Sequence, residues 1–71
     1  MIKFSEEVID NISRIIAERT GPDITDFFRM AGFPQIIHDG STKFRFVREQ
    51  LISLNNQDSG TESIKKILLY L

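Results

Sequence analysis

The stretch Thr20–Phe33, TGPDITDFFRMAGF, contains a helix start, an apolar helical face and a helix stop. Thr20 is a suitable N-cap, and Pro22 suits the first helical turn because it has no N–H to leave unpaired. Apolar side chains then recur at i, i+3, i+4 and i+7, at Ile24, Phe27, Phe28 and Ala31. Gly32 permits a left-handed end, after which Phe33 can fold back. Because so short a helix is not stable alone in water, the stretch predicts a helix packed by neighbours on its Phe face.

Two segments on either side of this stretch show the same combination of cap and spacing. A first helix is predicted from Ser5 to about Arg19, with an apolar face of Val8, Ile9, Ile12, Ile15 and Ile16. On its solvent side, Asp10 and Arg14 are spaced to pair at i, i+4. A third helix is predicted from a cap at Ser41 or Thr42 to about Leu54, with a stripe of Phe44, Val47, Leu51 and Leu54.

A fourth helix completes the pattern after a polar turn, Asn55–Gly60. Thr61 is its predicted cap, and its predicted inner face consists of Ile64, Ile67, Leu68 and Leu71. Between the second and third helices, Pro34 and the pair Asp39-Gly40 indicate a loop. Connections this short favour adjacent, crossed helices, so the fold class is all-α: a compact bundle of four short helices. We expect Phe27, Phe28 and Phe44 to meet in its core.

The chain of 71 residues is short enough for a single helical domain over 1–71, and its composition excludes several classes of protein. A net charge of -1 disfavours a dedicated nucleic-acid binder. With no Cys, neither a disulfide nor a thiolate metal site can form. The N-terminal residues lack the apolar run of a signal peptide, and no apolar run approaches the ~20 residues of a membrane span, so we expect a cytoplasmic protein.

The segment KKILLYL at the end of the sequence is unusually apolar for a terminus. Two interpretations account for this apolar character. Residues 1–71 are the N-terminal part of a longer multidomain protein, or a tail helix packs on its own domain.

The residues that could carry chemistry each have a simpler structural explanation. His38 lies beside Asp39, but general acid–base catalysis also needs a pocket and an orienting group, and no residue in the sequence supplies one. Asp23 and Asp26 lie one turn apart, yet two carboxylates make a poor cation site and suit a helix N-terminus. No phosphate-binding glycine pattern is present. We therefore predict that the domain is not an enzyme and has no cofactor or metal.

An interaction surface is the first functional prediction. Phe46 points away from the predicted stripe of the third helix, so it either fills space against the first helix or the His38 loop, or anchors a partner. Leu69 and Tyr70 lie off the inner face of the fourth helix, whose last turn is apolar nearly all round and needs covering. The predicted interaction residues are Phe46, Arg45, Arg48, Leu69 and Tyr70, with the arginines orienting an acidic partner. The partner would be another protein, a downstream domain of the same chain or, as a homodimer, a second copy.

Two other functions remain as alternatives. Lys43, Arg45 and Arg48 cluster on the third helix beside Phe44 and Phe46, a combination that could bind nucleic acid through phosphate and base contacts. Glu49 is spaced to pair with Arg45, however, which favours an ordinary solvated face. A structural spacer or dimerisation domain without an external ligand is the other alternative.

The run from Ile15 to Leu54 resembles a small helical N-terminal module of bacterial phage-defence proteins, the abortive-infection (AbiJ-type) and Ymh-like proteins. The resembling residues are Ile16-Ala17-Glu18, Thr20-Gly21, Ile24, Phe28, Gly32-Phe33, Gly40, Thr42-Lys43-Phe44-Arg45, Leu51 and Gly60. A Trp often stands in the family where this chain has Phe44. The resemblance implies an accessory module that senses, oligomerises or recruits and that precedes a toxic effector domain. It carries over no active-site residue.

Overall fold

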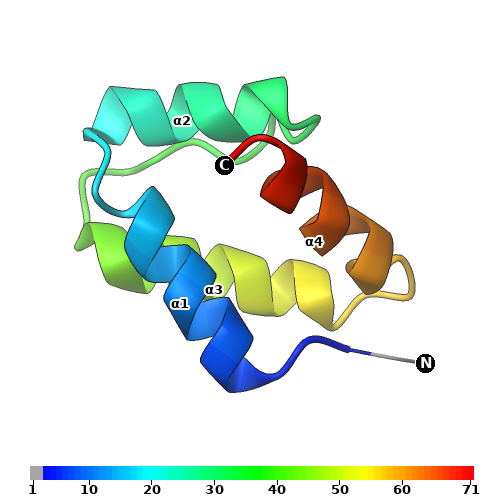
Figure 1. Cartoon of the computed structure of the whole chain (residues 1–71). Coiled ribbons are helices and arrows are strands. Elements are labelled where there is room, and N and C mark those ends of the chain that lie inside the picture. The colour runs from blue at the N-terminus through cyan, green and yellow to red at the C-terminus, as the bar shows by residue number, and fades with distance from the viewer. Residues whose placement is uncertain (1–2) are drawn as a thin grey trace.

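A computed structural model describes residues 3–71 of the chain as four helices, without strands in that range. They are α1 (Glu6–Ile16), α2 (Gly21–Met30), α3 (Lys43–Asn55) and α4 (Gly60–Leu69). α3 contacts both α1, which crosses it, and α4, which follows it through a tight turn, while α2 lies across the other side of the core (Figure 1). The radius of gyration is 11.0 Å, which confirms the predicted compact all-α bundle.

The ends of α2 are formed as the sequence predicts. The Thr20 hydroxyl accepts a hydrogen bond from the Asp23 N–H at 3.3 Å. At the other end, Gly32 adopts a φ of 100°, its N–H donates to the Arg29 carbonyl, and the Phe33 N–H donates to the Phe28 carbonyl at 2.8 Å. This pair of bonds is a Schellman motif, and it turns the buried Phe33 side chain back onto the core.

Two other helix boundaries differ from the predictions. α1 ends at Ile16, three residues before Arg19. α4 begins at Gly60 with Ser59 as N-cap, so the prediction of a cap at Thr61 is wrong. α4 starts close against the end of α3, where only glycine fits, because a Cβ atom at Gly60 would lie 2.5 Å from the Asn55 carbonyl oxygen.

The apolar core draws on all four helices and on the connection between α2 and α3. Its members are Ile9, Ile12, Ile16, Ile24, Phe27, Phe28, Ala31, Phe33, Ile36, Phe46, Val47, Leu51, Leu54, Ile64 and Ile67. The rings of Phe27 and Phe28 meet edge to face, with centroids 5.5 Å apart. The prediction that Phe44 joins them is wrong: Phe44 lies outside the buried cluster, and the Arg14 guanidinium lies 5.6 Å from its ring centroid.

Other predicted core positions are also exposed. Val8 and Ile15 of α1 and Leu68 and Leu71 at the end of the chain all face solvent. α1 packs mainly against α3, and its apolar face is wider than the surface that buries it. At α4, Ile64 and Ile67 suffice to fill the contact with α3.

Polar contacts between distant segments complete the packing. The Asn55 side chain binds both backbone groups of Phe4, accepting from its N–H at 3.1 Å and donating to its carbonyl at 2.9 Å. Arg48 of α3 donates to Asp10 of α1 at 2.6 Å, so Asp10 pairs across the helix crossing and not with Arg14 as predicted. Arg14 instead donates to Asn11.

Candidate interaction surfaces

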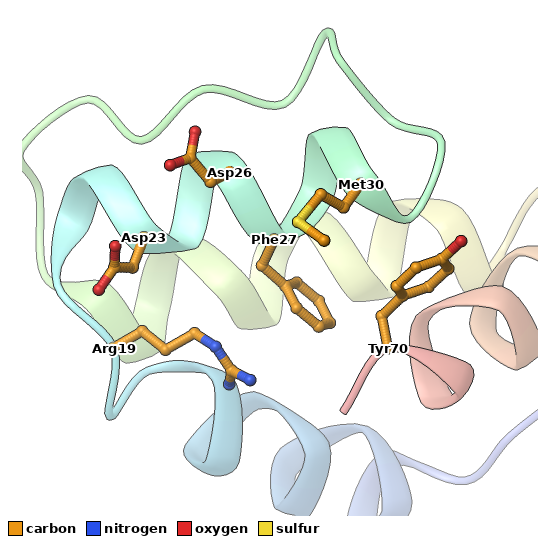
Figure 2. Close-up of a pocket in the computed structure, with 6 residues that line it drawn as sticks. All are labelled: Arg19, Asp23, Asp26, Phe27, Met30 and Tyr70. Atoms are coloured by element: carbon orange, nitrogen blue, oxygen red, sulfur yellow. The ribbon is translucent and has the colours of Figure 1, made fainter.

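A groove between α2 and the end of α4 is the first candidate site. It has a volume of about 290 Å³ and is lined by Arg19, Asp23, Asp26, Phe27, Met30 and Tyr70. Figure 2 shows Phe27 projecting from α2 towards Tyr70 and the Met30 side chain lying beside Phe27, with the carboxylates of Asp23 and Asp26 farther along α2. The four α2 residues lie at i, i+3, i+4 and i+7, so a single helical face forms this side of the groove.

The groove combines an apolar interior with charge at its edge. The Arg19 guanidinium lies 4.9 Å from the centroid of the Phe27 ring, a cation–π contact that holds it against the floor. Asp26 pairs with Arg29 at 3.0 Å, and both side chains are largely exposed. Within residues 3–71, the carboxylate of Asp23 forms no ion pair. The groove therefore offers apolar contact together with a carboxylate that a cation could reach.

Exposed apolar side chains continue from this groove over the end of α4. Leu69 is 82% exposed and Met30 64%, and Tyr70 and Leu71 are each more than two-fifths exposed. The sequence predicted Leu69 and Tyr70 as interaction residues; both are exposed, and Tyr70 lines the groove while Leu69 is not among its lining residues. The sequence did not predict Met30 or the groove itself, although the shared face of Asp23, Asp26, Phe27 and Met30 could be read from their spacing.

The first half of α3 forms a second, wider hollow of about 470 Å³, lined by Thr42, Phe44, Arg45, Arg48 and Glu49. Arg45 and Arg48 are thus brought together as predicted, but Arg48 already binds Asp10. Within the described part of the chain, Arg45 has no ion pair with Glu49, although Glu49 places a negative charge in the same hollow.

Phe46 does not belong to either surface. It is only 8% exposed, and its ring meets the His38 ring edge to face with centroids 5.0 Å apart. Of the two predicted alternatives, the structure selects the one in which Phe46 fills space against the His38 loop. As an exposed anchor for a partner, the prediction of Phe46 is wrong, because the connection between α2 and α3 covers it.

His38 holds this connection to the helices. Its backbone N–H donates to the Thr25 hydroxyl at 2.9 Å, and its Nδ1 accepts from the Gly40 N–H at 3.4 Å. Nδ1 is therefore the unprotonated nitrogen, and Nε2–H donates to the Ser41 carbonyl at 3.0 Å. Both ring nitrogens are engaged with the backbone of the same loop, so the ring acts as a structural bridge.

The Asp39 carboxylate is engaged in this loop as well. It accepts from the Ser41 N–H at 3.0 Å. Hydrogen bonds from the Ser41 hydroxyl and N–H hold the pKa of Asp39 below its ordinary value. Asp39 is thus committed to the turn and is not paired with His38 for proton transfer.

The part of the chain that the structure describes contains no group of three or more His, Asp or Glu side chains placed to hold a metal ion. Over the same residues, no helix has the length and apolar character to cross a membrane. Every buried side-chain nitrogen or oxygen among them has a hydrogen-bond partner.

The observed class is thus a four-helix, all-α domain with two open surface hollows. Comparison with known proteins adds no relative: no family model, no curated protein and no solved structure matches the chain.

Proposed function

We propose that this domain is a non-catalytic protein–protein interaction module whose binding surface is the groove between α2 and α4. The surface consists of Asp23, Phe27, Met30, Leu69 and Tyr70. The observation that carries the proposal is the exposure of Met30 and Tyr70 in a groove whose floor is Phe27, with the exposed Leu69 next to Tyr70 in the chain. Contiguous exposed apolar side chains with a polar edge are typical of protein-binding surfaces.

The α3 hollow supports a nucleic-acid function less well. One of its two arginines is committed to Asp10, and Glu49 adds negative charge to the same hollow. A nucleic-acid surface draws its affinity from cations that are free to contact phosphates. This function would be indicated by binding of fluorescein-labelled DNA or RNA that weakens steeply with added salt and on replacing Lys43 and Arg45 by Gln.

The resemblance to abortive-infection modules supplies the finer part of the proposal. On that basis, the domain would act in the bacterial cytoplasm as the N-terminal sensing or recruiting module of a phage-defence protein. An effector domain would follow it in the chain. The apolar surface described above would then be covered either by that effector or by a separate protein.

The test is site-specific photo-crosslinking in cells that produce the full protein. A benzophenone amino acid replaces Leu69 in one variant and Glu7, an exposed residue of α1, in the control. We expect a discrete protein adduct at position 69 that is absent at position 7. Equal labelling at both positions, or no protein adduct at position 69, would contradict the proposal.

A further inference from the structure

We propose that the partner of the α2–α4 groove is a second copy of this chain, whose α4 outer face, Lys65, Lys66 and Leu69, lies in the groove. This inference rests on the proposed function, because it names the occupant of the same surface. It follows from the match between what the groove offers and what α4 displays.

The groove calls for an occupant with an apolar side chain and positive charge close to it. Phe27, Met30 and Tyr70 provide apolar contact, and Asp23 and Asp26 also line the groove. Figure 2 shows the Asp23 carboxylate on the side of Arg19 and the Asp26 carboxylate turned away from Phe27. Asp26 shares its charge with Arg29, and the Arg19 guanidinium lies over the Phe27 ring, but within the residues described no ion pair involves Asp23. A buried apolar anchor with a lysine beside it would satisfy both features.

The outer face of α4 has this composition. Lys65 and Lys66 precede Leu69 by four and three residues, so all three lie on one side of the helix. All three are exposed, and neither lysine forms an ion pair in the described range 3–71. Leu69 has the largest exposed fraction of the large apolar side chains that face solvent.

The arrangement can close as a symmetric pair. α4 carries the projecting face, and its following residue, Tyr70, lines the groove, so the two halves of the contact adjoin each other on one molecule. A two-fold axis beside Leu69 and Tyr70 would place each α4 over the partner's α2, forming two equivalent contacts.

The test uses charge reversal in two variants that are each unable to pair with themselves. The first is Asp23→Lys/Asp26→Lys, which makes the groove basic. The second is Lys65→Glu/Lys66→Glu, which makes α4 acidic. Matched controls are Glu6→Lys/Glu7→Lys and Lys43→Glu/Arg45→Glu, which reverse the same number of charges at exposed positions of α1 and α3. Sedimentation equilibrium over about 10 μM to 1 mM measures association. This concentration range covers the micromolar to millimolar dissociation constants of weak dimers.

We expect the natural sequence to form dimers and the controls to retain them. Each charge-reversal variant should associate at least about tenfold more weakly, as should Leu69→Asp. An equimolar mixture of the two variants should recover association, because both contacts of the mixed pair then join opposite charges. This recovery should weaken as salt rises.

Each remaining outcome decides between the two proposals. A natural sequence that stays monomeric at 1 mM, or dimers that none of the groove and α4 variants weaken, would overturn this inference. If such a monomer still gives a discrete adduct with a different protein at position 69, the interaction function stands and only the second copy is wrong. If it gives no adduct, both proposals fail.

Discussion

Substitution of Gly21 by Ala tests the packing of the loop that covers Phe46. Gly21 is the first residue of α2 and has a helical backbone, but it precedes Pro22, whose ring crowds a Cβ atom on the preceding helical residue, so alanine carries some strain there. A Cβ atom at this position would also lie 2.8 Å from Nδ1 of His38. That is shorter than ordinary van der Waals contact, so the ring must move.

The magnitude follows from what holds the ring in place. Displacing His38 weakens its hydrogen bond to Ser41, worth about 0.5–1.5 kcal/mol, and its edge contact with Phe46, worth a similar amount. The loss of unfolded-state freedom on replacing Gly by Ala contributes about 0.4–1 kcal/mol in the opposite direction. We therefore expect Gly21→Ala to destabilise the domain by about 0.5–2 kcal/mol, or roughly 4–8 °C in Tm per kcal/mol.

The cost of Gly21→Ala should fall when the His38 ring is removed. In a His38→Ala background only the crowding against Pro22 and the lost unfolded-state freedom remain, so Gly21→Ala should be less destabilising by about 1 kcal/mol. Urea denaturation followed by circular dichroism at 222 nm measures all four members of this double-mutant cycle. An equal effect of Gly21→Ala in both backgrounds would refute the steric argument.

Two further predictions follow from the same part of the fold. Phe46→Ala should lower the free energy of unfolding, measured by urea denaturation, by about 3–5 kcal/mol, and Phe44→Ala by about 1 kcal/mol or less, because of the two only Phe46 is a core residue. If Phe46→Ala does not fold, Phe46→Leu should still destabilise the domain more than Phe44→Leu. The reverse order would contradict the core described above. NMR titration should find the pKa of Asp39 below its ordinary value and nearer to it in Ser41→Ala. Because the pKa of Asp39 is lower in the folded state, its contribution to stability is complete above the unfolded pKa and is lost as pH falls through the folded pKa. A difference in unfolding free energy between the natural sequence and Asp39→Asn that persisted below the folded pKa would contradict this reasoning.

Local chemistry accounts for the parts of the fold that the sequence predicts correctly. The caps at Ser5 and Thr20 and the stop at Gly32 depend on residues within one turn of each other. The positions of α2 and of most of α1 and α3 follow from these signals and from 3.6-residue spacing.

The sequence-based predictions are wrong where burial or ion pairing depends on a segment that is distant in the chain. By spacing alone, Phe44 belongs to the apolar stripe of α3 and Phe46 lies off it. The loop that carries His38 nevertheless covers Phe46, whereas Phe44 stays half-buried outside the core, with the Arg14 guanidinium over its ring. Likewise, Asp10 has a suitable partner four residues along α1, yet the crossing of α1 over α3 brings Arg48 closer. The spacing of residues along one helix does not predict how two helices cross.

Of the candidate site, the exposed apolar residues could be predicted from the sequence, but the groove could not. Leu69 and Tyr70 could be singled out because the end of α4 has more apolar side chains than one contact can bury. The groove required the fold, since its two sides come from segments some forty residues apart in the chain. The His38 contact with Gly21 and the Asn55 clamp on Phe4 likewise join distant positions, and nothing in the order of residues signals them.

The sequence by itself determined four short amphipathic helices and their all-α class, because helix starts, stops and apolar periodicity are properties of neighbouring residues. Only the tertiary structure decided which aromatic side chain of α3 is buried, which charges pair and where an apolar surface is left uncovered. Those outcomes depend on how helices cross and on which loop lies over which face, and a burial or an ion pair exists only once both of its sides are in place.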